Sequence, residues 1–298
     1  MSSVRPGVAA SVSYDRIAAQ YEQARGGVER ARQLAVVVLR WLPAGSLVCD
    51  VGAGTGVVGV QLRDAGVRVF GVDISAKMLA QARERLPGRI AVADAAALPV
   101  ADVSLDALTY VWVMHHVGDL PAALREARRV LRPGGLAVCV DGLALPREDE
   151  ADRVVAGLRR ALRHRKATVS GKPVADGAVV DSAVPAGGAV AVSSAVVAAG
   201  AGVDGTVIDS AVVAEAAVAA GLEVAARDVA VIEFGTSPAG LADALEQRLF
   251  NYVWDVDDAT WAAVVQPAVD TLRRLPDAAR VRRVQSHHPL CVLRRPAA

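Results

Sequence analysis

The 298-residue sequence has few aromatic residues, few cysteines and almost no net charge. Aromatic residues make up 4% of the chain and the formal net charge is +1, which gives no support for nucleic acid or an acidic membrane as a partner. Cys49, Cys139 and Cys291 stand alone in apolar runs, without C-x-x-C spacing or a plausible disulfide framework. We therefore expect three buried thiols in a reducing cytoplasm.

Long hydrophobic segments are also absent. Residues 1–16 contain no apolar core of signal-peptide length, which argues against export. Residues 182–203 are uncharged, but their alanine, glycine and serine content and one proline make them too weakly hydrophobic to span a membrane. We expect no membrane association. Hydrophobic residues still make up 53% of the chain, which is enough to build a globular core.

The sequence does contain a regular alternation of short valine-rich runs and amphipathic stretches. The predicted strands are 47–51, 68–72, 89–93, 107–111 and 137–140. The predicted helices between them are 76–85 and 120–131, the second ended by a Pro-Gly-Gly turn. This order is typical of a doubly wound α/β fold, a parallel sheet with crossover helices. In such folds ligands bind at the carboxyl ends of the strands.

The flanking regions are less regular. A helical segment over 14–42 precedes the first strand, and 152–166 reads as an amphipathic helix. Residues 167–208 are of low complexity, and DGAVVDSAV recurs there as DGTVIDSAV 28 residues later. Two copies indicate a local duplication and not a solenoid. The remaining predicted elements are a helix at 211–220, a strand at 223–234, a helical region from Leu241 and a last strand near 289–293.

The stretch DVGAGTGVVG, residues 50–59, fits two glycine-rich patterns at once. It matches G-x-G-x-x-G, typical of dinucleotide loops, and also D-x-G-x-G-x-G. Asp73 follows Gly54 by 19 residues and suits a ribose hydroxyl in both cases. Asp50 distinguishes the two patterns, because a carboxylate at the tip of the first strand repels a pyrophosphate and favours a cationic ligand. S-adenosylmethionine is such a ligand, with a sulfonium and an ammonium group and no phosphate.

Other residues near the strand ends fit the same ligand. Glycines alternating over 52–56 let the backbone pass close under a methionyl group, where a Cβ would collide. Asp94, at the end of the third strand, can accept a hydrogen bond from an adenine amino group. Ile74 and Met78 can enclose the adenine ring.

Five segments, in this order and spacing, resemble the class I S-adenosylmethionine-dependent methyltransferases, specifically their small-molecule branch: DVGAGTG, GVDIS, ADAAALP, VWVMHHV and LREARRVLRPGG. The resemblance covers residues 14–141. It implies a Rossmann-like, mostly parallel seven-stranded sheet with an antiparallel last strand, and an N-terminal helix that closes over the cofactor. YDRIAAQYEQAR resembles that helix, which makes Tyr14 and Tyr21 candidates to contact the methionyl end. Residues 167–208 depart from the family pattern, which usually has a short connection there.

The resemblance and the residues together predict a complete site and domain organisation. The predicted cofactor-binding residues are Tyr14, Tyr21, Asp50, Gly52, Ala53, Gly54, Thr55, Gly56, Asp73, Ile74, Met78, Asp94, Ala95 and Val111. The predicted organisation is a single methyltransferase domain over 1–298, with a helical cap at 1–44, a cofactor-binding half at 45–141, an insertion near the substrate lid at 167–208, and a sheet-completing, substrate-side region at 209–298.

Three residues are candidates for catalysis. His115 and His116 follow the fourth strand, and Asp141 ends the fifth, where a side chain can face the transferred methyl group. A general base helps a hydroxyl or an acidic carbon and is dispensable for an amine, so the two histidines can also be bystanders. For Asp141 the alternative is a turn residue. The aromatic side chains that can either roof an apolar substrate or pack in the core are Phe250, Tyr252, Trp254 and Trp261.

The predicted function is methyl transfer from S-adenosylmethionine to an oxygen, nitrogen or carbon atom of a small natural product or metabolite, leaving S-adenosylhomocysteine. The enzyme is expected to be a monomer or homodimer. Two alternatives stay open: a related fold that catalyses cyclisation or only binds the cofactor, and RNA or protein methylation, which the near-neutral charge disfavours. His287 and His288 lack partners at metal-ligand spacing, so no metal is expected.

Overall fold

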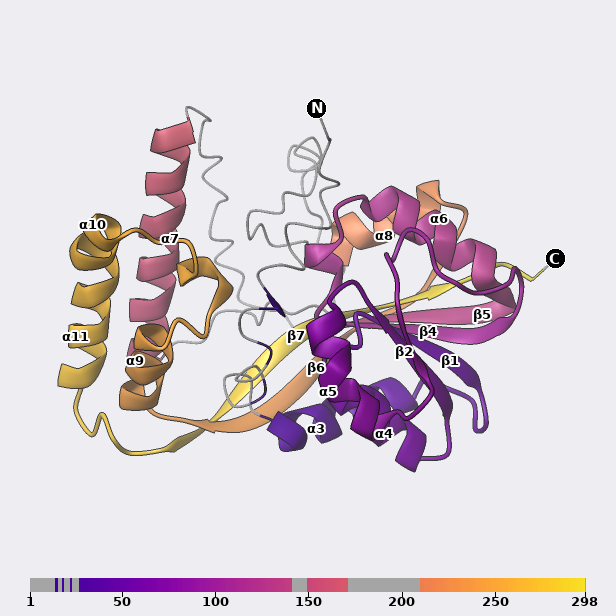
Figure 1. Ribbon diagram of the computed structural model, residues 1–298, viewed down its shortest axis with the longest axis horizontal. Helices are drawn as coiled ribbons and strands as arrows, with labels where there is room; N and C mark the ends of the chain where they lie inside the picture. Colours follow the sequence, from indigo (N-terminus) through magenta and orange to yellow (C-terminus); the bar gives the residue numbers. More distant parts are fainter. Residues whose placement is uncertain are drawn as a thin grey trace.

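A seven-stranded sheet forms the centre of the structure, a computed structural model that describes residues 14, 15, 18, 22, 27–140, 149–170 and 210–297. The strands are β1 (Leu47–Val51), β2 (Arg68–Asp73), β3 (Ile90–Val92), β4 (Leu105–Val111), β5 (Leu131–Val140), β6 (Glu223–Thr236) and β7 (Arg282–Arg294). Their order is β3-β2-β1-β4-β5-β7-β6 (Figure 1). The first five strands pair in parallel, whereas β7 is antiparallel to both β5 and β6. The predicted fold, with its antiparallel last strand, is confirmed.

The central strands are buried on both faces. Val48, Cys49, Asp50 and Val51 of β1 are all buried, as is typical of a parallel strand between two helical layers. Asp50 is therefore a carboxylate in a position that normally holds an apolar side chain. The three cysteines are buried free thiols, as predicted from their apolar surroundings.

Helices cover both faces of the sheet. The helices α3 (Gly27–Leu39) and α4 (Val57–Asp64) pack on one face, and α6 (Leu120–Val130) and α8 (Ser210–Ala219) pack on the other (Figure 1). The helix α5 (Ala76–Arg85) contacts β2 and β3. Leu34 and Leu124, one on each side, are completely buried, and each such burial contributes about 1.5 to 3 kcal/mol.

Side-chain caps explain where the two predicted crossover helices begin. The Ser75 hydroxyl accepts a hydrogen bond from the Met78 amide, and the Asp119 carboxylate accepts one from the Ala122 amide. The second helix, α6, ends slightly earlier than predicted, because Leu131 already pairs with β4. The Pro-Gly-Gly segment at 133–135 then forms an irregularity within β5, where the register shifts, and does not separate helix from strand.

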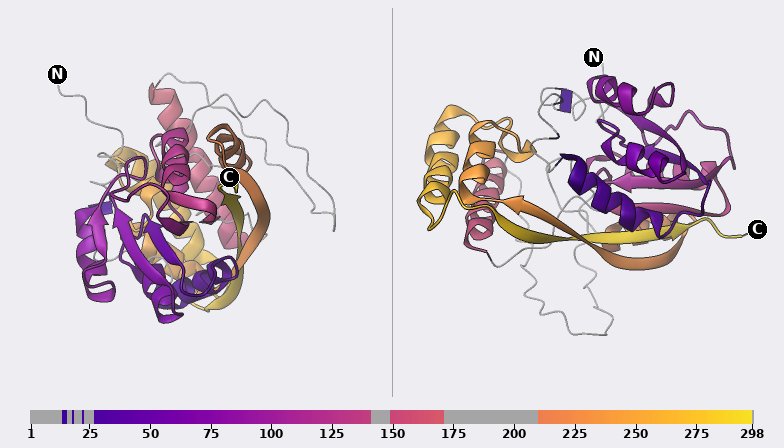
Figure 2. Two further views of the ribbon diagram at one scale, coloured as in Figure 1. Left: turned by 90° about the vertical axis from the view of Figure 1, so that its right-hand side faces the viewer. Right: turned by 90° about the horizontal axis from the view of Figure 1, so that it is seen from below.

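A second group of helices has its own hydrophobic cluster, and we call it the helical lobe. Its main members are α7 (Glu150–Ser170), α9 (Pro238–Glu246), α10 (Asp258–Thr260) and α11 (Gln266–Arg274). Leu158, Leu245, Val265 and Leu272 are buried together at its centre. The long strands β6 and β7 connect this lobe to the sheet (Figure 2). The predicted insertion at 167–208 begins within α7, and its part from 171 onward lies outside the described residues.

Within the described residues, no helix is long and apolar enough to cross a membrane.

Candidate active site

The glycine loop, residues 52–56, joins β1 to α4 at the carboxyl end of the sheet. Gly52 and Gly54 have φ of +73° and +57°, which side-chain-bearing residues rarely adopt. A Cβ on Gly52 would lie 2.3 Å from Val113 Cγ2, so at this position the crowding comes from the protein itself. A Cβ on Gly54 would meet only Met78 Cε, at 3.3 Å, and a backbone oxygen at 4.0 Å. Gly54 is thus the least crowded of the three loop glycines, because its nearest neighbour is the flexible end of the Met78 side chain.

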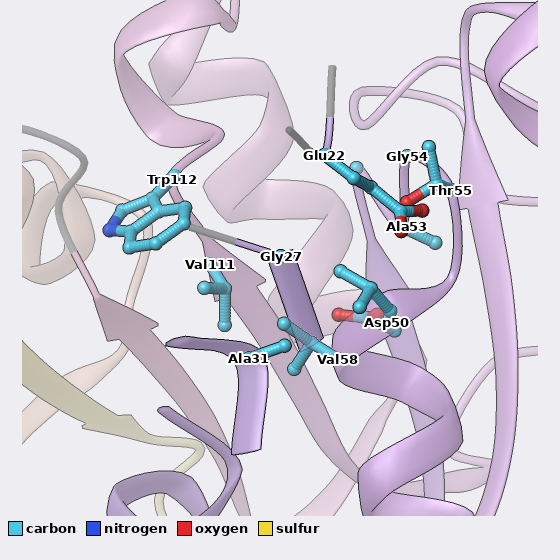
Figure 3. Close-up of a pocket in the computed structure, with 12 residues that line it drawn as sticks. Glu22, Gly27, Ala31, Asp50, Ala53, Gly54, Thr55, Val58, Val111 and Trp112 are labelled. Carbon is cyan, nitrogen blue, oxygen red and sulfur yellow. The ribbon is translucent and has the colours of Figure 1, made fainter. Parts of the chain in front are cut away.

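A pocket with about 530 Å³ of empty space, part of it open to solvent, lies at this loop (Figure 3). Its lining holds two carboxylates, Glu22 and Asp50, and no basic residue, among the residues that the structure describes. This charge pattern favours a cation and disfavours a pyrophosphate. The predicted cofactor residues that line the pocket are Asp50, Gly52, Ala53, Gly54, Thr55 and Val111.

Asp50 lies at the base of this pocket and is only 2% exposed. One of its oxygens accepts a hydrogen bond from Thr109 Oγ1, at 2.7 Å. The pKa of Asp50 is raised to about 6, mainly by burial and to a smaller extent by the nearby carboxylate of Asp73, while the Thr109 bond opposes the shift. A positive ligand in the pocket would favour the ionised form of Asp50.

Asp73 ends β2 and connects the glycine loop with the start of α5. Its two oxygens accept hydrogen bonds from the backbone amides of Gly54 and Ser75, both at 2.8 Å. Burial raises the pKa of this carboxyl group, and the amide bonds work in the opposite direction. The carboxylate is therefore held in one orientation beside the loop, where its remaining lone pairs can accept from ribose hydroxyls.

The residues predicted for the adenine end lie near the loop but not in the pocket lining. Met78 is buried with its Cε beside Gly54, and Ile74 is half-buried directly after Asp73.

Asp94 Oδ1 accepts from the Ala96 amide at 2.9 Å in an exposed turn. Gly56 caps the start of α4, and Ala95 lies in the same turn as Asp94. Their contacts with a cofactor stay predictions.

Tyr14 and His116 are in direct contact. The Tyr14 hydroxyl lies 2.6 Å from His116 Nε2, and the two rings meet edge to face with centroids 5.1 Å apart. The ring of Trp254, from the helical lobe, packs against Tyr14 in the same manner at 5.3 Å. His115 lies next to His116, with ring centroids 4.0 Å apart. The structure thus brings a predicted cofactor residue, a predicted base and one of the predicted roof residues together.

The other predicted roof residues pack inside the helical lobe. Phe250 and Tyr252 stack with centroids 5.4 Å apart, and Trp261 lies under the guanidinium of Arg248 at 4.4 Å. For these three the interpretation as core residues fits better than a substrate roof. Tyr21 and Asp141, predicted as a cofactor contact and a candidate base, lie outside the described residues, and their roles stay predictions.

Six pocket residues were not predicted from the sequence, and two of them, Glu22 and Trp112, have side chains that can interact with a ligand. Glu22 belongs to the segment predicted as a cap, and nothing in its spacing marks it. Trp112 follows β4 with φ of +57°, a strained conformation for a bulky residue, and the Arg30 guanidinium stacks on its ring at 3.9 Å. A bulky residue directly after a strand tip was the available signal. In the described part of the chain, no three His, Cys, Asp or Glu side chains are grouped to hold a metal.

Comparison with known proteins agrees with this geometry. Residues 49–139 match a family model described as a methyltransferase domain. A demethylmenaquinone methyltransferase from Roseiflexus castenholzii is 36% identical over 145 residues, covering 45% of this chain and 60% of that protein. Over these residues the chain is similar to the class I S-adenosylmethionine-dependent methyltransferases.

A second curated relative shows the same partial match. A ubiquinone/menaquinone biosynthesis C-methyltransferase from Paracoccus denitrificans is 35% identical over 148 residues, covering 45% of this chain and 58% of that protein. The chain thus spans about 60% of the length of these curated relatives.

Solved structures extend the likeness to the whole fold. The [4+2]-cyclase SpnF aligns over 98% of this chain and 97% of its own, with a TM-score of 0.58 and 21% identity. A phosphoethanolamine N-methyltransferase 2 from Haemonchus contortus aligns over 99% of this chain and 60% of its own, with a TM-score of 0.52 and 16% identity. At these identities the likeness concerns the fold alone.

Proposed function

We propose that the protein transfers a methyl group from S-adenosylmethionine to a small molecule. The observation that carries this proposal is the pocket at the glycine loop, with Asp50 at its base and Asp73 beside it. The Thr55 hydroxyl is buried there without a hydrogen-bond partner among the described residues, so a polar group is left for a ligand. The residues present therefore fit this cofactor.

Each carboxylate of the site has a separate task in the proposal. Asp73 accepts from the ribose hydroxyls, Asp50 favours the positive charge of the methionyl part, and Asp94 accepts from the adenine amino group. When bound, the cofactor supplies a methyl carbon activated by a sulfonium leaving group. The protein's contribution is to align the nucleophile with that carbon and to exclude water, and such positioning supplies about 7 to 11 kcal/mol in favourable cases.

The contact between Tyr14 and His116 supports a proton acceptor on the substrate side. In the proposal, the Tyr14 hydroxyl takes the proton of the nucleophile and passes its own to His116 Nε2. Deprotonated in this way, the nucleophile would be ready to accept the methyl group that bound S-adenosylmethionine supplies, and the proton would stay on His116. A positioned base of this kind contributes about 10² to 10⁴-fold.

For the substrate we propose a hydroxylated aromatic ring, such as a reduced quinone. The curated relatives are named for the methylation of demethylmenaquinone and for ubiquinone and menaquinone biosynthesis. In this chain, the rings of Tyr14, Trp254 and His116 gather at one place, which suits a flat apolar ring carrying a hydroxyl group. The helical lobe that contributes Trp254 lies outside the matched residues 49–139, so this substrate class rests on the two observations together.

A turnover assay tests the function. The purified chain is incubated with labelled S-adenosylmethionine and reduced naphthoquinones or a metabolite extract, and the products are followed by mass spectrometry. The proposal expects a product heavier by one methyl group, together with an equal amount of S-adenosylhomocysteine. A cyclised product of unchanged mass, with the cofactor not consumed, would establish the alternative chemistry instead. Label found only in RNA or protein would also contradict the proposal.

A further inference from the structure

Three of the described residues before α3 contact side chains that follow β2 or β4 or end α5, and Glu22 among them lines the cofactor pocket. Tyr14 bonds His116, the Asp15 carboxylate accepts from Ser75 Oγ, and the Glu22 carboxylate accepts from Arg85. Ser75 is the residue whose backbone amide is bound by Asp73. We call Tyr14, Asp15 and Glu22 the N-terminal anchors.

Arg85, at the end of α5, makes the most extensive of these contacts. Its Nη2 donates to Glu22 Oε2 at 2.9 Å and its Nη1 donates to Glu22 Oε1. The same Nη1 also donates to the Thr55 carbonyl oxygen in the glycine loop, at 2.8 Å. The fork of one guanidinium thus holds both oxygens of a carboxylate and a loop carbonyl. Figure 3 shows the Glu22 carboxylate beside the loop residues.

We propose that Arg85 is a positioning residue for cofactor binding, which joins Glu22 to the glycine loop and so holds the N-terminal anchors over the bound cofactor. The inference rests on the proposed cofactor site. By holding the Thr55 carbonyl group, Arg85 keeps the peptide planes of the glycine loop in one orientation. The methionyl part of the cofactor is proposed to lie against this loop. Because Glu22 lines the same pocket, opening of the contact between Glu22 and Arg85 would loosen one wall of the site that holds the cofactor.

A purely structural brace would behave differently. The side chains of Arg85 and Glu22 are 28% and 24% exposed, and an ion pair near the surface contributes little to stability by itself. If the pair only secured α5, its loss would change the melting temperature and leave cofactor dissociation unchanged. If Arg85 positions the loop and the anchors, its loss shortens the lifetime of the bound cofactor.

A double-mutant cycle on the full chain tests the proposal, with S-adenosylhomocysteine as the probe. The variants are Arg85→Gln, Glu22→Gln and the double substitution, and Arg83→Gln, exposed on the same helix, is the control. Affinity is measured by calorimetry and dissociation by stopped flow. We expect each single variant to raise Kd about three- to tenfold, mainly through faster dissociation. This increase in Kd is modest for the loss of a charged hydrogen bond, because the pair is partly exposed.

The cycle also distinguishes coupling from independent effects. If the two residues act as one contact, the double variant binds no more weakly than the weaker single variant. Additive losses, or an unchanged dissociation rate with a lowered melting temperature, would overturn the proposal. If Arg85→Gln does not fold, Glu22→Gln alone still tests the dissociation rate, since it leaves α5 intact. A wild-type protein that does not bind S-adenosylhomocysteine would instead refute the cofactor assignment itself.

Discussion

The Tyr14 hydroxyl and His116 Nε2 lie 2.6 Å apart, although 102 residues separate them in the chain. This contact joins the region before α3 to the helical turn that follows β4, and Trp254 of the helical lobe packs against the same tyrosine ring. Residues from three distant parts of the sequence therefore meet where the nucleophile is proposed to bind.

Replacing Tyr14 by phenylalanine tests the proton relay. The ring contacts stay, but the hydroxyl that passes the proton to His116 is lost, so we expect kcat to fall roughly 10- to 100-fold, within the range of general base effects. The KM for S-adenosylmethionine should change little. Tyr252→Phe, which removes a hydroxyl in the helical lobe, is the matched control. Equal losses in both variants would show that the Tyr14 hydroxyl has no special part in turnover.

The two adjacent histidines can be separated in the same assay. His116→Gln removes the group bonded to Tyr14, and we expect a loss of about 10²-fold or more in kcat. His115→Gln removes only a neighbouring ring, so its effect should be several-fold smaller. The affinity of each variant for S-adenosylhomocysteine, measured by calorimetry, shows whether the site is still formed. A larger loss in His115→Gln would make His115 the base.

Much of the fold was predictable because local patterns determine it. The limits of β1 and α5 were predicted without error, because both depend on local signals. The signal for β1 is a valine-rich run bounded by glycine, and the signal for α5 is a serine cap. The last strand was predicted only near 289–293, whereas β7 begins at Arg282. In its first half β7 pairs only with β6 and carries mostly polar residues, so its extent depends on a partner distant in sequence.

The candidate site was likewise predictable only in part from the sequence. Asp50 and Asp73 were predictable, because tips of neighbouring parallel strands meet at one edge of the sheet. The contact of Glu22 with Arg85 spans 63 residues and depends on how the chain before α3 lies across the loop. No local pattern reports such a contact, and side chains that meet only through tertiary packing were therefore missed.

Asp94 can be tested with a modified ligand. If its carboxylate accepts from the adenine amino group, Asp94→Ala should weaken S-adenosylhomocysteine binding by about 1 to 3 kcal/mol. S-inosylhomocysteine has an oxygen in place of that amino group, so its affinity should not fall in the variant. Calorimetry with both ligands makes the comparison. An equal loss for both would mean that Asp94 acts only through its turn, by way of the Ala96 amide.

Asp50 gives a pH dependence with opposite signs for binding and for stability. Its pKa in the folded protein is about 6, above the ordinary value of 3.8, mainly because the group is buried. A carboxyl group shifted in this direction favours folding most below about pH 4, and this contribution is lost as the pH rises through 6. Ligand binding needs the ionised form, so S-adenosylhomocysteine affinity should rise over the same interval.

Asp50→Asn should separate these two effects. The asparagine amide oxygen can still accept from Thr109, and the side chain carries no charge. At pH 8 the ligand-free variant should therefore melt roughly 2 to 4 °C higher than the wild type. A shift of this size corresponds to about 1 kcal/mol. The difference should vanish near pH 4, where Asp50 is itself neutral. At pH 8 the variant should bind S-adenosylhomocysteine more weakly, and its affinity should no longer change through pH 6. A variant that melts lower at pH 8 and keeps the wild-type pH dependence of binding would show that Asp50 serves the structure and not the ligand.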